Sequence, residues 1–463
     1  MTLGIPKSHL MLEEDLPLIQ LCHVFAQGSI WLSNGMYKQV ATYDLFVRDM
    51  PAARNFMVAA GLEEILTWLG KLRFSEEDIA LLKEAGFISD EFGEYLRQFR
   101  FTGTVFALKE GTVFFPYEPV VRVTAPLIEA SVIETYLMSA LASNVPFATK
   151  AARLKLAIGD KIRLTVGPFR AHSFESGMKA SRAALFYGIN SLGNFSVAKK
   201  YGLPVPKPPI IAQHLFIKSF SDELSAFRAI TRAYPGRGAF MVDTYDFEQG
   251  IENAVRVFGE LKADGHPATA VVIDSGDIIQ RAKYARQKLD AAGFTEAKIV
   301  LGGNIDELKL LELVEKNTPC DLALSVTEYV TLSDSPKLEV VYKLAELRLE
   351  DKVHYAAKLT PGKLSYPGRK QVYRTFNADG VFSSDVIGLD NENPGEPLLE
   401  KVMERGKVVK PLPPLSEIQQ HAMVQLSKLP SLLRDIRGSQ PYNVAPSQQL
   451  EKLLQEVRKV HIA

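Results

Sequence analysis

The chain has 463 residues, of which 46% are hydrophobic and 23% are charged, so it is long enough for two domains with a sizeable buried core. Its 54 basic residues balance its 54 acidic residues. A net charge of zero argues against general binding to nucleic acid or to a membrane surface.

The chain has only two cysteines, Cys22 and Cys320, which argues against a disulfide framework or a cysteine zinc site and favours a reducing compartment. The first residues lack the apolar core of a signal peptide. No apolar run reaches the length that spans a membrane. The sequence therefore predicts a soluble, cytoplasmic protein.

Residues 1–125 mix helical and strand-like patterns. Apolar residues recur at helical spacing over 8–35, and apolar and polar residues alternate over 39–48. Ser75 and Asp78 have the spacing of a helix capping box. The other elements expected in this part are a helix over 62–72 and strands over 103–108, 112–115 and 120–123. We therefore expect an N-terminal α+β domain with a small antiparallel sheet.

The pattern changes at residue 126, where a long helix over 127–156 with a break at Pro146 is expected. Strands and helices then alternate. The expected strands are 163–166, 210–212, 239–242, 268–273, 298–301 and 322–326, and the expected helices are 176–187, 221–232, 247–264, 278–291 and 305–316. Such βα units predict a parallel sheet, and about six of them favour a barrel over an open sheet. This second domain covers 126–335. Residues 336–463 return to short strands and turns and end in helices.

Polar residues follow several of these strands. Asp274-Ser275-Gly276-Asp277 follows the strand over 268–273, and His214 follows the strand over 210–212. Because parallel strands place their carboxyl ends at one edge of the sheet, these residues are expected to meet there. Carboxylates suit ribose hydroxyls or magnesium, and helix N-termini suit a phosphate. Taken alone, an aspartate after a strand is more often the N-cap of the next helix.

Ordered motifs along the chain resemble those of a known family. They include Arg100-Phe101-Thr102-Gly103, Glu110-Gly111-Thr112-Val113-Phe114, Ala148-Thr149-Lys150-Ala151-Ala152-Arg153, Val242-Asp243-Thr244-Tyr245-Asp246, Asp274-Ser275-Gly276-Asp277 and Lys358-Leu359-Thr360-Pro361-Gly362-Lys363. On these motifs, residues 10–375 resemble the nicotinate phosphoribosyltransferases, which are type II phosphoribosyltransferases.

The resemblance implies an activity. The family joins nicotinate to phosphoribosyl pyrophosphate to give nicotinate mononucleotide and pyrophosphate. Mg²⁺ assists, and ATP hydrolysis is coupled through transient phosphorylation of a histidine. His214 occupies the matching place, and a neutral imidazole is a good nucleophile towards a phosphoryl group. By the same match, Asp274 lies at the ribose or at the phosphorylated ring. A structural histidine at a helix start is the alternative for His214.

The resemblance also implies a set of substrate-binding residues. Arg170 is a candidate clamp for a phosphate or a carboxylate, since a guanidinium binds either in a bidentate manner. The full set is Asp15, Phe169, Arg170, Asn194, Ser275, Gly276, Asp277, Gly302, Gly303, Ser325 and Thr327. No residue is assigned as a metal ligand. Lys343, Lys358 and Lys363 are further cationic candidates, for which a solvated surface is the alternative.

The fold implied by the resemblance is an irregular α/β (TIM-like) barrel of βα units plus an α/β sandwich domain built from the N- and C-terminal parts. Family members form homodimers in which the N-terminal domain of one subunit completes the active site of the other. Asp15 and Arg48 would then lie near the barrel of the partner. The expected partners are small-molecule substrates, with no nucleic acid and no membrane.

The chain departs from the family pattern within the site. Pro17 follows Asp15-Leu16, where the family has an aromatic residue; Phe169 and Val272 each replace an arginine; and Leu324-Ser325-Val326-Thr327 replaces Gly-Val-Gly-Thr. Phe169 either supplies a new stacking face or packs in the core. Three interpretations therefore stay open. They are a nicotinate phosphoribosyltransferase, an enzyme of the same fold that uses another heteroaromatic acceptor, and a non-catalytic paralogue.

Overall fold

The structure is a computed structural model that describes residues 13–191, 195–204, 207 and 209–461. The chain forms two compact units. Unit 1 contains the described residues up to Pro146 together with 337–433 and 440–461, and unit 2 contains the described residues of 147–336 together with 434–439. The division after the N-terminal part therefore falls at Pro146 and not at residue 125. The reason is that most apolar side chains between Leu127 and Val145 are buried in the core of unit 1.

Unit 1 is organised around a seven-stranded antiparallel sheet in the order β14-β13-β1-β5-β3-β18-β19. Its strands are β1 (Val40–Val47), β3 (Thr104–Leu108), β5 (Pro119–Pro126), β13 (Val340–Leu349), β14 (Lys352–Tyr355), β18 (Leu399–Glu404) and β19 (Lys407–Val408). The sheet is larger than the small N-terminal sheet predicted, because four of its strands come from the C-terminal part of the chain. The prediction of only short strands after residue 336 was wrong for β13, which has ten residues.

Unit 1 has two smaller sheets, one in the order β17-β15-β16-β20 and one formed by β2 and β4. Their strands are β2 (Met57–Val58), β4 (Val113–Phe114), β15 (Lys370–Phe376), β16 (Phe382–Leu389), β17 (Glu396–Pro397) and β20 (Val444–Pro446). The helices assigned to this unit are η1 (Glu13–Ile19), α1 (Cys22–Ser33), η2 (Met36–Lys38), α2 (Leu62–Lys71), α3 (Glu76–Glu84), α4 (Asp90–Arg97), α5 (Leu127–Val132), α15 (Leu415–Ser427) and α17 (Gln448–His461). Two further helices, α6 (Glu134–Ile158) and α16 (Ser431–Arg434), run across the division between the units.

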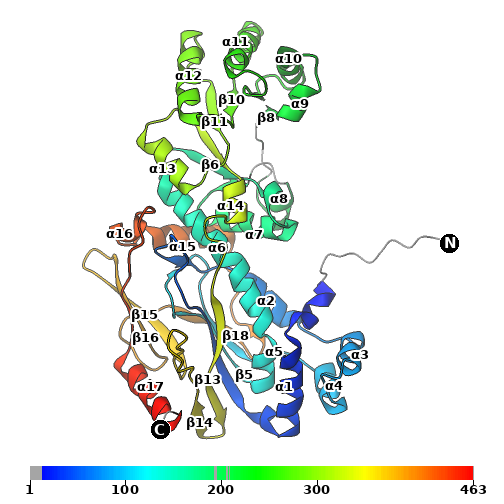
Figure 1. Cartoon of the computed structure of the whole chain (residues 1–463), viewed down its shortest axis with the longest axis vertical. Coiled ribbons are helices and arrows are strands. Elements are labelled where there is room, and N and C mark those ends of the chain that lie inside the picture. Colours follow the sequence, from blue (N-terminus) through cyan, green and yellow to red (C-terminus); the bar gives the residue numbers. More distant parts are fainter. Residues whose placement is uncertain (1–12, 192–194, 205–206, 208, 462–463) are drawn as a thin grey trace, which may run out of the picture. The chain divides into compact units, whose positions relative to one another are not determined.

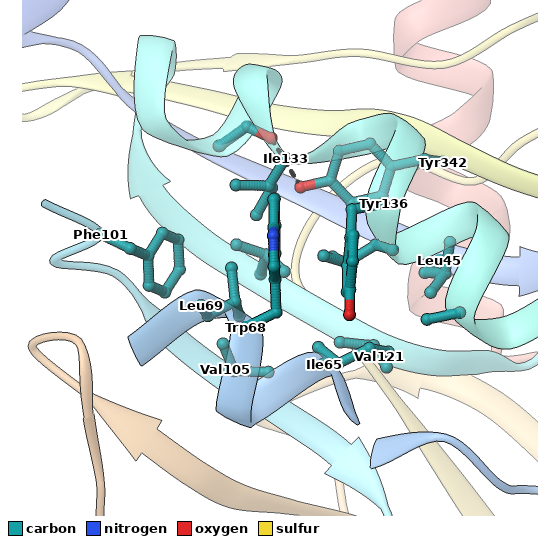
Figure 2. Packing of buried hydrophobic residues seen from close by; sticks show 14 of the residues in the cluster. Leu45, Ile65, Trp68, Leu69, Phe101, Val105, Val121, Ile133, Tyr136 and Tyr342 are labelled. Atoms are coloured by element: carbon teal, nitrogen blue, oxygen red, sulfur yellow. Dashed lines mark hydrogen bonds between the residues drawn. The ribbon is translucent and has the colours of Figure 1, made fainter. Parts of the chain in front are cut away.

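Aromatic side chains from the helices fill the core of unit 1 against the large sheet. The Trp68 and Tyr136 rings stack with their centroids 4.0 Å apart, and the Tyr342 hydroxyl donates a hydrogen bond to the carbonyl oxygen of Ala130 at 2.8 Å (Figure 2). Stacked and hydrogen-bonded aromatics of this kind contribute packing area together with fixed geometry. The capping box of Ser75 and Asp78 is confirmed at the start of α3.

The long helix predicted over 127–156 is broken, but the predicted break at Pro146 was wrong. The break lies at Ile133, between α5 and α6, and Pro146 lies inside α6. At the start of α6 the side-chain oxygen of Gln20 accepts a hydrogen bond from the Thr135 backbone N–H at 3.0 Å. This contact satisfies one of the free N–H groups that a new helix start creates, and it comes from a residue distant in the sequence.

Unit 2 contains a seven-stranded parallel sheet in the order β7-β6-β12-β11-β10-β9-β8. Its strands are β6 (Arg163–Val166), β7 (Asn190–Ser191), β8 (Ile210–Ala212), β9 (Gly238–Met241), β10 (Ala270–Ile273), β11 (Lys298–Leu301) and β12 (Leu322–Ser325). The six predicted strands are all present. The seventh, β7, has two residues and is too short to give a periodic pattern.

The sheet of unit 2 is a parallel half-barrel flanked by helices, which confirms the predicted α/β class, whereas the predicted irregular (TIM-like) barrel is not confirmed as such. β7 and β8 form its two edges, and no strand pairing closes the sheet within the described part of the chain. These edge strands have two and three residues, which leaves little backbone for a ladder of hydrogen bonds. Closure of a barrel needs such a ladder between its first and last strands.

Helices connect successive strands of unit 2. They are η3 (Pro168–Arg170), α7 (Phe174–Leu185), α8 (Phe195–Tyr201), α9 (His214–Lys218), α10 (Glu223–Ala233), α11 (Phe247–Ala263), α12 (Ile278–Ala291), α13 (Glu307–Glu315) and α14 (Thr327–Thr331). In Figure 1, α10, α11 and α12 lie side by side. No helix among the described residues combines the length and the apolar character needed to cross a membrane.

The stretch of residues 148–153 that matches the family motif has a structural role in unit 2. Lys150 is fully buried and bonds Asp334 at 2.5 Å and Glu307 at 3.0 Å. Arg153 donates to Glu307 at 2.8 Å and to the Ile436 carbonyl at 3.1 Å. Buried charges are tolerated because each one is paired, so these residues anchor α6 to α13.

Gly250 provides a test of how α11 packs on the sheet. A Cβ atom at Gly250 would lie 2.0 Å from the Val242 carbonyl oxygen, whereas Gly259 on the same helix has no such neighbour within 4 Å. We expect Gly250→Ala to lower the free energy of unfolding by about 1–3 kcal/mol through overpacking. Gly259→Ala should raise it by about 0.5–1 kcal/mol, because alanine favours a helix. Urea unfolding of both variants checks this, and equal effects would contradict the proposed close approach.

Candidate active site

A cavity of about 540 Å³ lies at the carboxyl ends of the unit 2 strands. Its apolar lining comes in part from the ends of four strands, namely Ile211, Met241, Val272 and Leu324. Its polar lining comes from the connections that follow the strands and includes Arg170, Gln213, His214, Asp274, Asn304 and Thr327. Ligands bind at this end of parallel α/β sheets, so the predicted convergence of polar residues is found in unit 2.

His214 is oriented from both sides of its ring. Its Nδ1 lies 3.0 Å from the Thr244 hydroxyl, and its Nε2 lies 3.3 Å from Asp274 Oδ1. The three residues follow β8, β9 and β10, which are neighbours in the sheet. The His214 side chain is 36% exposed and lines the cavity. His214 is the first residue of α9, but Gln213 occupies the N-cap position, so a role in starting the helix does not account for the imidazole.

Asp243 lies beneath this pair and was not among the predicted site residues. Its side chain is only 1% exposed. Its Oδ2 accepts hydrogen bonds from the Asp274 backbone N–H at 3.0 Å and from the Ser275 hydroxyl at 2.6 Å. Its Oδ1 has no hydrogen-bond partner among the described residues. Asp243 follows the end of β9 as Asp274 follows β10, and this shared position was the signal that could have identified it.

His214, Asp243 and Asp274 each offer a ligand atom, and these three atoms lie within 4.8 Å of one another. Burial raises the pKa of Asp274, and the neighbouring Asp243 carboxylate raises it further, while His214 opposes both effects. Two carboxylates side by side hold a proton or a cation more readily than isolated ones. The arrangement can therefore share a proton, accept hydrogen bonds from hydroxyls, or bind a divalent cation.

The turn after β10 divides its residues between two roles. Asp277 is the N-cap of α12, and its side chain accepts hydrogen bonds from the backbone N–H groups of Ile279 and Gln280. Asp274 faces the cavity instead. Ser275, Gly276 and Asp277 are not among the residues that line the cavity. The capping interpretation therefore holds for the second aspartate of the motif, whereas the first one belongs to the site.

Gly302 and Gly303 line the cavity and also allow two loops to meet. A Cβ atom at Gly303, whose φ is +82°, would lie 2.1 Å from the Asp274 carbonyl oxygen. A Cβ atom at Gly302 would lie 3.1 Å from Asp274 Cβ. Only glycine permits this approach at a positive φ. The pair thus brings the loop after β11 against the turn after β10 and leaves backbone exposed to a ligand.

Phe169 and Arg170 lie on η3 and line the cavity. The Phe169 side chain is 69% exposed, so the interpretation that it packs in the core was wrong. Its ring lies over Gly167, where a Cβ atom would come within 2.8 Å of the ring. Glycine at 167 therefore lets the ring lie against the backbone while one face stays open. Arg170 is exposed next to it.

Of the remaining predicted residues, Thr327 lines the cavity, whereas Ser325 and Asp15 do not. Ser325 is fully buried and donates its hydroxyl to the Ile305 carbonyl at 2.6 Å, so its side chain is not available to a ligand. Thr327, two residues later, does line the cavity. Asp15 lies in η1 of unit 1 and is not among the lining residues. Asn194 lies outside the described residues.

Fold and site together define an α/β protein with a ligand cavity at the carboxyl ends of a parallel half-barrel sheet. The family model of the nicotinate phosphoribosyltransferase N-terminal domain matches residues 24–142, and that of the C-terminal domain matches residues 394–454. A nicotinate phosphoribosyltransferase of Mycobacterium tuberculosis is 34% identical over 91% of this chain and 90% of its own. One of Bacillus subtilis is 32% identical over 95% of this chain and 94% of its own.

The crystal structure of human nicotinic acid phosphoribosyltransferase matches with a TM-score of 0.79 at 25% identity, covering 95% of this chain and all of that one. The chain therefore belongs to the nicotinate phosphoribosyltransferase family, and it is an enzyme of this type. The resemblance seen in the sequence is confirmed, and the interpretation as a non-catalytic paralogue loses its support.

The two aspartates of the turn should affect stability in opposite directions. The pKa of Asp274 is raised in the folded protein, so stability is lost as the pH rises through that pKa. Asp274→Asn should therefore increase the free energy of unfolding at pH 7, and this gain should vanish at acid pH. Asp277→Ala should decrease it by about 1 kcal/mol through loss of the cap. Urea unfolding at both pH values measures each effect, and a stabilised Asp277→Ala would contradict the assignment.

Proposed function

We propose that the enzyme transfers phosphoribose from phosphoribosyl pyrophosphate to nicotinate and couples this transfer to ATP hydrolysis through phosphorylation of His214. The observation that carries the proposal is the setting of the His214 ring, which is held at both nitrogens and is still open to the cavity. A nucleophile must be both oriented and accessible. A buried structural histidine would be oriented but closed to a phosphoryl donor.

The transfer step needs charge stabilisation more than covalent help. The ribose C1–oxygen bond to pyrophosphate breaks, the pyrophosphate leaves with the electron pair, and the pyridine nitrogen forms the new bond. The transition state resembles an oxocarbenium ion with a negative leaving group, which fixed charges stabilise. Asp274 is suited to accept hydrogen bonds from ribose hydroxyls, since it is half-buried and faces the cavity.

Magnesium fits the carboxylates of the site. Asp243 and Asp274 would hold it, because Mg²⁺ prefers carboxylate oxygens together with water or substrate phosphates. The Oδ1 atom of Asp243 supports this assignment, because it is buried and lacks a hydrogen-bond partner among the described residues. When bound, Mg²⁺ supplies positive charge to the departing pyrophosphate.

Phe169 and Arg170 suit a planar aromatic carboxylate such as nicotinate. An open phenyl face stacks on a pyridine ring, and a guanidinium pairs with a carboxylate. A second candidate acceptor, a less acidic heteroaromatic base, is favoured by the lining at Val272, where the family has an arginine. Ile211, Met241 and Leu324 line the cavity with it. An acceptor panel that spans nicotinate, nicotinamide and quinolinate distinguishes the two.

A homodimer with a shared active site is part of the proposal. Large apolar side chains in the connections after β6, β7, β8 and β9 of unit 2 are exposed, namely Phe174 at 93%, Phe195 at 63%, Leu215 at 83% and Tyr245 at 63%. Such exposed apolar side chains favour coverage by another protein surface.

The two thiols, which form no disulfide, favour a reducing compartment such as the cytoplasm.

Unit 1 has cations that a diphosphate would need. Burial lowers the pKa of Lys343, Glu134 opposes this, and the nearby Arg48 and Lys358 lower it further. The Nε atom of Arg48 is buried without a hydrogen-bond partner among the described residues. Cations that repel one another gain stability from an anion between them. In a shared site, this cluster of one subunit would meet the cavity of its partner.

The coupling is tested by measuring pyrophosphate release from phosphoribosyl pyrophosphate and nicotinate, with and without ATP. We expect ATP to stimulate release by the wild type, and His214→Ala to abolish both ATP hydrolysis and the stimulation while unstimulated transfer persists. His266→Ala is the control, because that histidine is exposed and lies at the opposite end of the sheet, after α11. Release that is unaffected by His214→Ala would overturn the coupling. No release with any acceptor would overturn the transferase proposal.

The shared site is tested with a mixed dimer. His214→Ala and Lys358→Ala chains carrying different tags are co-expressed, and the heterodimer is purified. A site built from unit 2 of one subunit and unit 1 of the other leaves one intact site in two, so roughly half of the wild-type ATP-stimulated activity is expected. If each subunit uses its own unit 1, both sites are damaged and the heterodimer is as inactive as its parents.

A further inference from the structure

Arg281 reaches back from α12 over the Asp274–Asp277 turn. Its Nη1 donates hydrogen bonds to the Ser275 carbonyl at 2.9 Å and to the Ser275 hydroxyl oxygen at 3.1 Å. A Cβ atom at Gly276 would lie 2.6 Å from the guanidinium carbon, so the absence of a side chain at this position leaves room for Arg281. The guanidinium also lies 4.8 Å from the centre of the Phe247 ring, which restrains it from the other side.

Through Ser275, Arg281 is connected to the buried carboxylate of the site. The Ser275 hydroxyl accepts from Arg281 and donates to Asp243 Oδ2 at 2.6 Å. Arg281 Nη1 itself lies 4.0 Å from the same oxygen. Asp243 is almost completely buried beside another carboxylate, and a carboxylate in this position needs a nearby cation or donors to stay charged.

We propose that Arg281 is a positioning residue of the active site, acting on Asp243 and on the backbone of Asp274 through Ser275. Arg281 does not line the cavity, so it touches no substrate there and differs from a catalytic residue. It holds the turn, and the turn holds the two carboxylates at the edge of the cavity. The catalytic consequence rests on the proposed phosphoribosyl transfer.

The same helix provides a matched control. Arg286 also lies on α12 and is also partly buried, and it donates to the carbonyl groups of Phe294 and Ala297 and to Asp290. It makes at least as many hydrogen bonds as Arg281, but it binds the loop after α12 and not the site. A merely structural role for both arginines therefore predicts similar losses from Arg281→Met and Arg286→Met.

We expect Arg281→Met and Arg281→Ala to lower kcat for pyrophosphate release by about tenfold to a hundredfold, since charged hydrogen bonds that fix reacting groups have effects of this size. Arg286→Met should shift the unfolding midpoint and leave kcat unchanged. Millimolar guanidinium should restore activity to Arg281→Ala, because the ion fits the space between Phe247 and Gly276. Arg281→Lys should retain part of the activity, since lysine keeps the positive charge but lacks the planar, forked set of guanidinium donors.

A measurement without turnover separates this proposal from the transferase proposal. Hydrogen–deuterium exchange of peptides covering 274–277 should be faster in Arg281→Ala than in the wild type or in Arg286→Met. A wild type without transferase activity would overturn the proposed function, and the exchange result would then decide the role of Arg281. Unchanged exchange, or an active wild type with unchanged kcat in Arg281→Ala, overturns the positioning role.

Discussion

The hydrogen bond from the Asp274 backbone N–H to Asp243 Oδ2 is the contact on which the site depends. The ladder between β9 and β10 ends where the Val242 N–H donates to the Val272 carbonyl at 3.1 Å. Beyond this point the next backbone donor, the Asp274 N–H, bonds the Asp243 side chain instead of a backbone carbonyl. The two strand ends are thus joined by a side chain in place of the backbone. The same bond puts two carboxylates next to each other, which electrostatic repulsion alone would prevent.

Two glycines make that junction possible from opposite sides. Gly250 lets α11 pack against the Val242 carbonyl at the end of β9, and Gly303 lets the next loop pack against the Asp274 carbonyl after β10. Each contact would be blocked by a methyl group. Backbone packing on both sides therefore limits how far the strand ends can move apart. The His214 ring, which reaches both Thr244 and Asp274, depends on this fixed separation.

The sequence predicted the elements of unit 2 well because its strands are short apolar runs and its five predicted helices begin at residues whose side chains cap them. The helix over 278–291 has the bounds expected, and Asp277 explains its start. Whether the sheet closes into a barrel could not be predicted, because periodicity records which residues are buried and not which sheet edges pair. The start of α6 after Ile133 is bonded by Gln20, a contact between distant parts of the chain that local signals cannot reveal.

The site shows the same limit. The motif Asp274-Ser275-Gly276-Asp277 was identified, but its spacing could not tell which aspartate caps the helix and which faces the cavity. The motif stretch with Lys150 and Arg153 was matched equally well, and yet it forms a buried ion network away from the cavity lining. A match to a family thus identifies important residues, but it does not tell whether a residue stabilises the fold or takes part in the reaction. That distinction requires knowing what each side chain contacts.

A comparison of two buried carboxylates shows how hydrogen bonding helps to distinguish a structural residue from a residue of the site. Asp385 in unit 1 is fully buried, and its two oxygens accept hydrogen bonds from Arg374 and Tyr442, so its bonding is complete within the protein. Asp243 is nearly as buried, but one of its oxygens has no partner among the described residues. A buried carboxylate left in this state lowers stability unless something else binds it. What distinguishes Asp243 is its position, because its neighbours His214 and Asp274 open onto the cavity, and its unpartnered oxygen is therefore the one on which the proposed magnesium site rests.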